Sequence, residues 1–185
     1  MNFLSFPNFN FITGFIPFLI YLLVFLINLC SFSKDVKSRL YSRTLYTKKQ
    51  KYFTLIYKLL ALVNIIIFFI TPISFYTNTF LIGSILFLLG LLGLTLALQT
   101  YSKSPINNPI INWLYKFSRN PQMFSLWLIF LGISLMINSF LSIFLLFIAI
   151  LLSHQSVLAE EEYCKSKYGI EYEKYLKAVP RYLFF

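Results

Sequence analysis

Five apolar segments dominate this chain, and all but the fourth, which is short, are about as long as the hydrocarbon core of a membrane is thick. A helix needs roughly 20 consecutive apolar residues to cross that core. Hydrophobic residues make up 58% of the 185 residues and charged residues only 12%. A soluble domain of this length could not bury so much apolar surface, so the chain is predicted to be an all-α, polytopic integral membrane protein. The five predicted transmembrane helices are residues 11–32, 55–76, 80–98, 123–138 and 140–158.

The sixteen Lys and Arg residues all fall on one side of these five spans. They lie between or just inside spans one and two, between spans three and four, and after span five, whereas the residues before span one, 77–79 and 138–139 carry none. Basic loops stay cytoplasmic, so we expect the N-terminus outside and the C-terminus in the cytoplasm. This topology, together with attraction to anionic lipid, explains the net charge of +10 without a nucleic-acid partner.

Several chemistries are excluded by the residue types present. A single histidine, His154, cannot supply a multi-histidine metal site, and no CxxC or HExxH spacing occurs, so no metal is expected. Cys30 and Cys164 both fall at or beyond predicted cytoplasmic span ends, which disfavours a disulfide. No glycine-rich loop follows a predicted strand. A nucleotide-like cofactor would therefore have to bind between helices and loops.

Small residues and turn signals organise the second half of the chain. Gly83, Gly90 and Ala97 recur at intervals of seven, which allows a neighbouring helix backbone to come close. The last two spans form a tight hairpin, and a polar helix continues from it into the cytoplasm, is interrupted at Gly169 and ends at Val179-Pro180. Folding this hairpin would bring the segment before span four close to the segment after span five.

Two motifs lie in those two segments. Glu160-Glu161, Tyr168-Gly169, Tyr172, Tyr175 and Val179-Pro180-Arg181 resemble the ending of the isoprenylcysteine carboxyl methyltransferase and phospholipid methyltransferase superfamily of membrane enzymes. Arg119-Asn120-Pro121 is similar to that superfamily's other signature, with asparagine in place of histidine. Both motifs occur in the expected order, and the resemblance covers about residues 99–182.

The resemblance implies binding of S-adenosylmethionine in a pocket that faces the cytoplasm. It divides the chain into residues 1–98, three transmembrane helices with a basic cytoplasmic loop at 33–54, and residues 99–185, a catalytic region of cofactor loop, helical hairpin and C-terminal helix. The implied cofactor-binding residues are Asn107, Asn108, Pro109, Ile110, Tyr115, Asn120, Pro121, Gln122, Met123 and Glu160. Ser156 and Arg119 would contact the substrate, and Glu161 would be the catalytic base.

The acceptor stays open between two membrane-anchored substrates. A prenylated cysteine carboxylate needs no base, whereas a phospholipid amine must lose a proton, to a base such as Glu161. Relatives often carry an arginine where this chain has Ser156, and its loss disfavours a carboxylate. Two other readings remain: a lipid or sterol double-bond reductase that uses a nicotinamide cofactor, and a membrane scaffold without catalytic activity.

Overall fold

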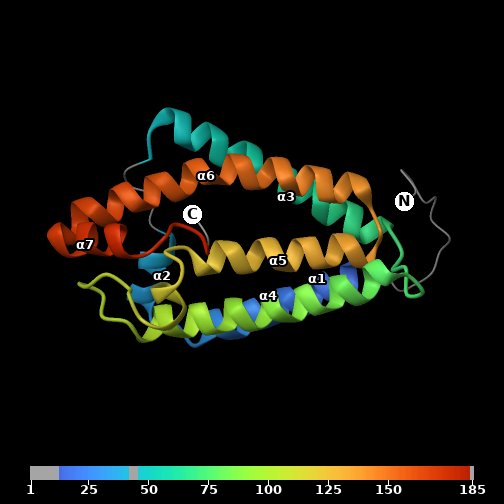
Figure 1. The fold of residues 1–185 in the computed structure, drawn as a ribbon, viewed down its shortest axis with the longest axis horizontal. Coiled ribbons are helices and arrows are strands. Elements are labelled where there is room, and N and C mark those ends of the chain that lie inside the picture. The colour runs from blue at the N-terminus through green and yellow to red at the C-terminus, as the bar shows by residue number, and fades with distance from the viewer. Residues whose placement is uncertain (1–12, 42–45, 184–185) are drawn as a thin grey trace.

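The computed structural model describes residues 13–41 and 46–183, and it is helical almost throughout (Figure 1). Among these residues there is no strand beyond an isolated bridge between Thr13 and Pro72. The elements are α1 (Phe15–Cys30), α2 (Lys34–Tyr41), α3 (Lys48–Ile70), α4 (Asn78–Lys103), the 3-10 helix η1 (Trp113–Lys116), α5 (Pro121–Met136), α6 (Phe140–Tyr168) and α7 (Ile170–Ala178). The all-α prediction is confirmed.

The five apolar helices α1, α3, α4, α5 and α6 match the five predicted spans in order. By length and composition α3, α4 and α6 can cross a membrane, and α1 and α5 are shorter apolar helices of 16 residues each. The part of the first predicted span before residue 13 lies outside the described residues. The division of the chain at residues 98 and 99 stays a prediction.

The basic segment 33–54, expected to be a loop, contains the helix α2 and the first turns of α3. Helix α3 begins at Lys48, well before the predicted start at residue 55, because a capping box stops it from fraying there. The Thr47 side chain accepts from the Gln50 backbone N–H at 3.2 Å, and the Gln50 side chain accepts from the Thr47 backbone N–H at 2.9 Å. Apolar length alone does not reveal such a polar start.

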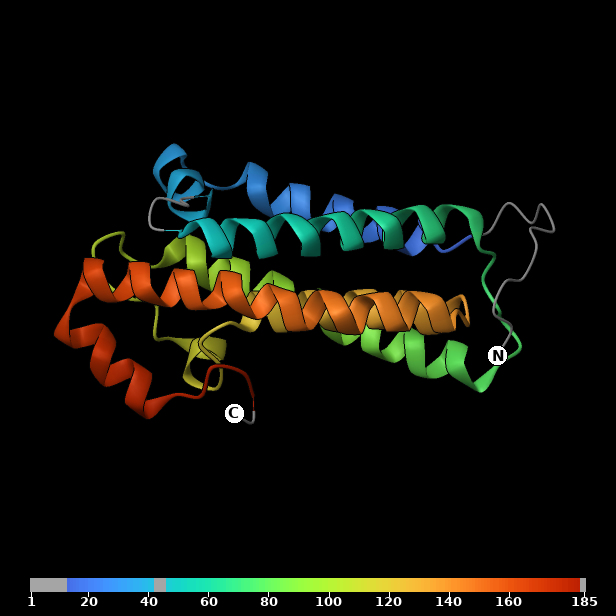
Figure 2. The same cartoon turned by 90° about the horizontal axis from the view of Figure 1, so that it is seen from above.

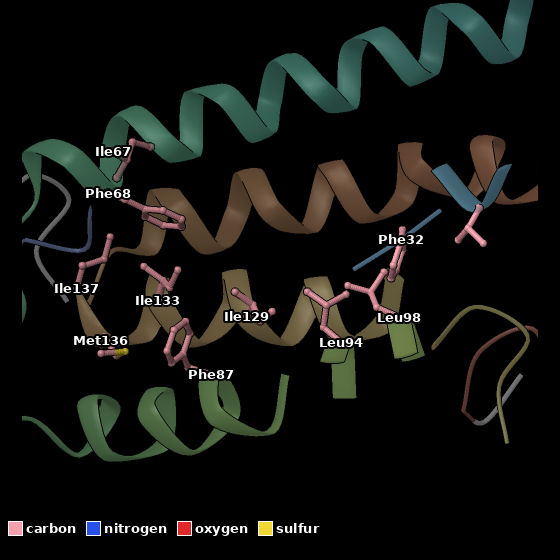
Figure 3. Close-up of a cluster of buried hydrophobic side chains, with 11 residues drawn as sticks. Phe32, Ile67, Phe68, Phe87, Leu94, Leu98, Ile129, Ile133, Met136 and Ile137 are labelled. Atoms are coloured by element: carbon pink, nitrogen blue, oxygen red, sulfur yellow. The ribbon is translucent and has the colours of Figure 1, made fainter. Parts of the chain in front are cut away.

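The apolar helices pack in pairs, α4 along α5 and α3 along α6, as two views of the bundle show (Figures 1 and 2). The main core lies where these pairs meet, and much of it comes from α4 and α5 (Figure 3). Its most deeply buried side chains are Phe68, Leu94, Leu98, Ile129 and Ile133.

Helices α4 and α5 touch backbone to backbone at Gly83 and Gly132. A Cβ placed on Gly132 would lie 2.6 Å from the Gly83 carbonyl oxygen and 2.7 Å from the Phe87 backbone nitrogen. This is the close approach that the spacing of Gly83, Gly90 and Ala97 predicts, and all three are buried.

All the polar elements gather at one end of the bundle. Helix α2, the segment 104–120 and α7 lie together there, and α1 begins at the other end, near the α5–α6 turn (Figures 1 and 2). The grouping agrees with the one-sided charge distribution of the sequence.

We expect Gly132→Ala to destabilise the bundle by about 1–3 kcal/mol, because backbone atoms cannot move away from the added methyl group as a side chain can. Thermal unfolding of the purified protein in detergent measures this. Gly93→Ala is the matched control, because its added Cβ comes close only to the Ser125 side chain, which can rotate. Equal losses for the two variants would show that the Gly83–Gly132 contact is not tight.

Candidate active site

Helix α6 runs past the apolar region and carries the chain into the predicted C-terminal helical segment. It ends at Tyr168, and α7 follows after Gly169, whose φ of 54° lies in the left-handed region that glycine adopts at little cost. The interruption at Gly169 and the end of the helix before Pro180 are both as predicted. This break turns α7 so that residues 179–182 return to the bundle (Figure 2).

The returning segment is held by Glu161, which lies buried on α6. Arg181 donates to both of its carboxylate oxygens, from Nε to Oε1 at 3.0 Å and from Nη2 to Oε2 at 2.8 Å. Arg119 Nη2 lies 3.3 Å from Oε1 as well, and the side chains of Arg119 and Glu161 are each only 9% exposed. The hydrogen bond with Glu161 raises the pKa of the Arg181 guanidinium. One carboxylate therefore joins three segments of the chain.

The segment before α5 adds further hydrogen bonds to the same junction. The backbone N–H of Arg119 donates to the Pro180 carbonyl at 3.0 Å, and Arg119 Nη1 donates to the Leu176 carbonyl at 3.1 Å. The carbonyl of Arg181 accepts from Ser118 Oγ at 3.2 Å and from Asn120 Nδ2 at 3.3 Å. The predicted convergence of Arg119-Asn120-Pro121 with the Glu160-Glu161 pair is thus confirmed.

Tyr182 completes the attachment of the C-terminal segment. Its ring packs 4.9 Å from that of Trp127 on α5, and its hydroxyl lies 3.1 Å from Nδ1 of His154 on α6. Burial raises the pKa of the Tyr182 phenol to about 12, so it stays protonated at neutral pH. His154 therefore has a polar partner at the site.

Tyr115 and Gln122, both expected to contact the cofactor, lie together. Gln122 Nε2 donates to the Tyr115 hydroxyl at 2.9 Å, and the Tyr115 carbonyl accepts from the Tyr175 hydroxyl at 2.6 Å. Tyr115 is buried, and burial raises the pKa of its phenol. Pro121 is buried at the first position of α5, a favourable place for proline, and the next two residues are half-buried.

Glu160 occupies a different environment from Glu161, because successive helical residues point about 100° apart. Its Oε1 accepts from the hydroxyl of Tyr46 at 3.2 Å, and the same hydroxyl lies 3.3 Å from the Ser156 carbonyl. The Ser156 hydroxyl is buried and lies 2.6 Å from that of Thr54 on α3. Ser156 therefore links α6 to α3, and contact with a substrate stays a prediction.

The predicted cofactor loop is anchored from two sides. Arg39 of α2 donates from Nη1 to the Pro105 carbonyl and from Nη2 to the Asn108 carbonyl, each at 3.1 Å. The Tyr168 hydroxyl donates to the Ile106 carbonyl at 3.2 Å. Along the loop Asn107 and Asn108 are exposed, Pro109 is half-buried and Ile110 is buried.

Tyr101, near the end of α4, connects the two halves of the site. The Arg39 guanidinium lies 5.1 Å from its ring centroid, and Tyr101 also packs against buried Tyr115. Tyr101, Arg39 and Tyr46 were not among the predicted site residues, because the basic segment had an adequate explanation in topology and Tyr101 ends an apolar run.

The two adjacent glutamates thus have separate roles. Both oxygens of Glu161 are occupied by guanidinium groups, which fits a structural junction better than the expected catalytic base. Arg119 is likewise occupied by Glu161 and the Leu176 carbonyl, and its substrate role stays a prediction. Glu160 instead accepts from the hydroxyl of Tyr46.

This second environment fits the donor set of S-adenosylmethionine. The cofactor carries an amino group and a ribose diol, which a carboxylate such as Glu160 can bind, and an adenine ring, which tyrosine faces can stack against. A half-buried carboxylate that is hydrogen-bonded to Tyr46 supplies both kinds of group. Among the described residues no cluster of His, Cys, Asp and Glu could hold a metal ion.

Comparison with known proteins gives one match. The sequence model of the family described as phospholipid methyltransferase matches residues 66–171, more than half of the chain. No curated protein and no solved structure matches significantly. The matched range runs from the end of α3 into α7 and contains Tyr101, Arg119 and both glutamates of the site.

We expect Glu161→Gln to release the C-terminal segment, because removing one partner of a buried ion pair costs about 3 kcal/mol or more. Trypsin should then cleave after Arg181 much faster than in the unchanged protein, with release of residues 182–185 followed by mass spectrometry. Glu162→Gln removes the same charge from an exposed side chain whose contact is a 3.4 Å bond from Gln50, and it should change little. Equal cleavage rates for the two variants would contradict the junction role of Glu161.

Proposed function

The chain belongs to the phospholipid methyltransferase family, and we propose that this membrane methyltransferase moves a methyl group from S-adenosylmethionine to the amine of a membrane phospholipid. The observation that carries the proposal is the placement of Glu160. It lies half-buried on α6, where its Oε1 accepts from the Tyr46 hydroxyl, inside the range that the family model matches.

The residues around Glu160 suit cofactor binding more than proton chemistry. S-adenosylmethionine supplies a methyl group activated by a positively charged sulfur. Glu160 would hold the amino group or the ribose, and the rings of Tyr101 and Tyr115 offer faces to the adenine. Arg39 and Tyr168 hold the loop in place by its carbonyls. Fixed positioning of this kind can supply much of the catalysis of an in-line displacement.

The choice of a phospholipid amine as the acceptor rests on the family and on the neutral side chain of Ser156. A carboxylate acceptor would favour a fixed positive charge beside it, and this position carries a buried serine bonded to Thr54. A phospholipid amine needs no such charge, but its ammonium form must first lose its proton, which in this proposal goes to water because both oxygens of Glu161 are bound to arginine. The free amine then takes the methyl group, and S-adenosylhomocysteine leaves. Glu161, with both oxygens occupied, acts in this proposal as a positioning residue that keeps the Arg119 segment and the C-terminal segment together.

The one-sided basic residues support a cytoplasmic site with the N-terminus outside. The elements that frame the site all lie at the polar end of the bundle (Figure 1); they are α2, segment 104–120 and α7. The acceptor would reach the site from within the bilayer.

We expect Glu160→Gln to weaken S-adenosylmethionine binding about tenfold or more, because a charge-assisted hydrogen bond at a partly desolvated site contributes about 1.5–3 kcal/mol. Calorimetry on detergent-purified protein measures the affinity. Tyr46→Phe removes the bond to Glu160 but keeps the carboxylate, so a smaller loss is expected. Glu162→Gln controls for net charge.

If the Glu160→Gln and Glu162→Gln variants bound S-adenosylmethionine with equal affinity, Glu160 would not be a cofactor ligand. Stabilisation by NADPH, with none by S-adenosylmethionine, would favour the reductase reading. Stabilisation by neither would favour a scaffold.

The acceptor and the orientation can be tested in one assay with sealed membrane vesicles. Radiolabelled S-adenosylmethionine added outside should label lipid in inverted vesicles and not in right-side-out ones, since the cofactor does not cross the bilayer. The label should sit in a base-stable lipid, as an N-methyl group does. Base-labile label released as methanol would indicate a carboxyl ester, and a farnesylcysteine analogue run in parallel tests that acceptor. Labelling only in right-side-out vesicles would show that the protein has the opposite orientation in the membrane.

A further inference from the structure

A cavity of about 530 Å³ lies between the end of α4 and η1, and it shares Pro105 with the loop 105–110 of the site described above. Its volume falls within the range of roughly 300–1,000 Å³ that is usual for small-molecule sites. None of its lining residues belongs to the predicted cofactor set. The lining residues are Leu96, Gln99, Thr100, Lys103, Ser104, Pro105, Asn112, Trp113 and Lys116.

The cavity faces away from the candidate active site. Its four α4 residues, from Leu96 to Lys103, follow the spacing i, i+3, i+4, i+7 and so share one face of the helix. Ala97 and Tyr101, which pack toward Tyr115, lie on the opposite face. At about 100° per residue the two faces are more than a quarter turn apart, so α4 separates the cavity from the Glu160 region.

The polar part of the cavity is positively charged. Lys103 and Lys116 both line it, and neither ammonium group has an ion-pair or hydrogen-bond partner among the described residues. No acidic residue occurs between Asp35 and Glu160, so none stands on the elements that form the cavity. Gln99 and Asn112 add amide donors. These groups are suited to bind a phosphate.

The apolar part continues down the same face of α4. Leu96 lies seven residues before Lys103, about 10 Å further into the membrane at 1.5 Å per residue. The row extends through Leu92, Leu89, Leu88 and Ile85, and each of these side chains is more than half exposed. A charged head region thus lies directly above an open apolar stripe, which is the polarity of a phospholipid.

Trp113 marks the boundary between the two parts. It is 72% exposed and has a φ of 51°, a left-handed conformation that is strained for a bulky side chain. Such strain occurs where the surrounding structure enforces it, often at binding sites. The conformation presents an indole beside the cavity, and tryptophan is favoured at the level of lipid headgroups.

We propose that this cavity binds the phosphate headgroup of an anionic phospholipid, with an acyl chain along the exposed face of α4. This lipid is distinct from the methyl acceptor, and the proposal does not depend on methyl transfer. In this proposal Lys103 and Lys116 bind the phosphate ester of the lipid.

Trp113 itself can report on occupancy. With Trp127→Phe as background, Trp113 is the single tryptophan of the chain. The protein is reconstituted in phosphatidylcholine vesicles, and brominated phosphatidylglycerol or brominated phosphatidylcholine is added as quencher. We expect phosphatidylglycerol to bind next to Trp113 about tenfold more strongly than phosphatidylcholine, since each nearby lysine adds attraction for an anionic lipid.

Two double variants separate a specific site from general surface charge. Lys103→Gln with Lys116→Gln should abolish the preference for phosphatidylglycerol. Lys174→Gln with Lys177→Gln removes the same charge from exposed positions of α7 and should keep it. Equal quenching by the two lipids, or an equal loss of preference in both double variants, would overturn the proposal. Displacement of the lipid by glycerol phosphate as effectively as by short-chain phosphatidylglycerol would also overturn it, because the ligand would then be a soluble phosphate ester.

Discussion

The buried carboxylate of Glu161 is the interaction on which the polar end of this protein depends. It binds Arg181 through both oxygens and Arg119 through one, so α6, the segment before α5 and the C-terminal segment meet at a single charge. Burying charges is costly unless they are paired and hydrogen-bonded. The neighbouring carbonyl of Leu176, which accepts from Nη1 of Arg119, adds to that pairing. The Nε of Arg119 is buried without a hydrogen-bond partner among the described residues, so the pairing of this guanidinium is incomplete.

This junction has consequences for the groups around it. Because residues 179–182 are held against α5 and α6, the Tyr175 hydroxyl can donate to the Tyr115 carbonyl. The Tyr115 hydroxyl in turn accepts a hydrogen bond from Gln122. The ordering extends through Tyr101 to Arg39 and the loop 105–110. Glu160 stands at the side of this network that faces Tyr46. The acidic cluster therefore combines a structural residue and a candidate cofactor ligand at neighbouring positions.

The glycine contact between α4 and α5, which lies inside the bundle, affects how closely the residues of the site approach one another. Gly83 and Gly132 bring the two backbones together near the end opposite the site, and Gly90 continues the contact toward it. Without side chains between them the two helices stay close, so Tyr101 at the end of α4 can reach Tyr115, six residues before the start of α5. The small-residue spacing on α4 predicted such an approach, but it did not identify α5 or Gly132 as the partner.

Much of the fold was predictable because each feature has a local cause. Apolar length gives the five helices, Asn138-Ser139 gives the hairpin, and Gly169 with Pro180 gives the break and the end of the C-terminal helix. The meeting of Arg119 with the glutamate pair was also predictable, because a hairpin forces its two flanks together. The contribution of Arg39 and Tyr46 to the site was not predictable. Basic residues beside a span are fully explained by topology, and α2 has no apolar signal of its own.

The sequence by itself determined that this is a membrane protein, which segments are helical, and that one end would collect the charged residues and both motifs. These follow from hydrophobic length and from charge, which act residue by residue. Only the tertiary structure decided which glutamate pairs with arginine and which accepts from Tyr46, that Ser156 bonds to α3, and that α4 carries a basic cavity on its outer face. Those outcomes depend on the rotation of each helix about its axis, and that rotation is set by packing against neighbours that lie far away in the sequence.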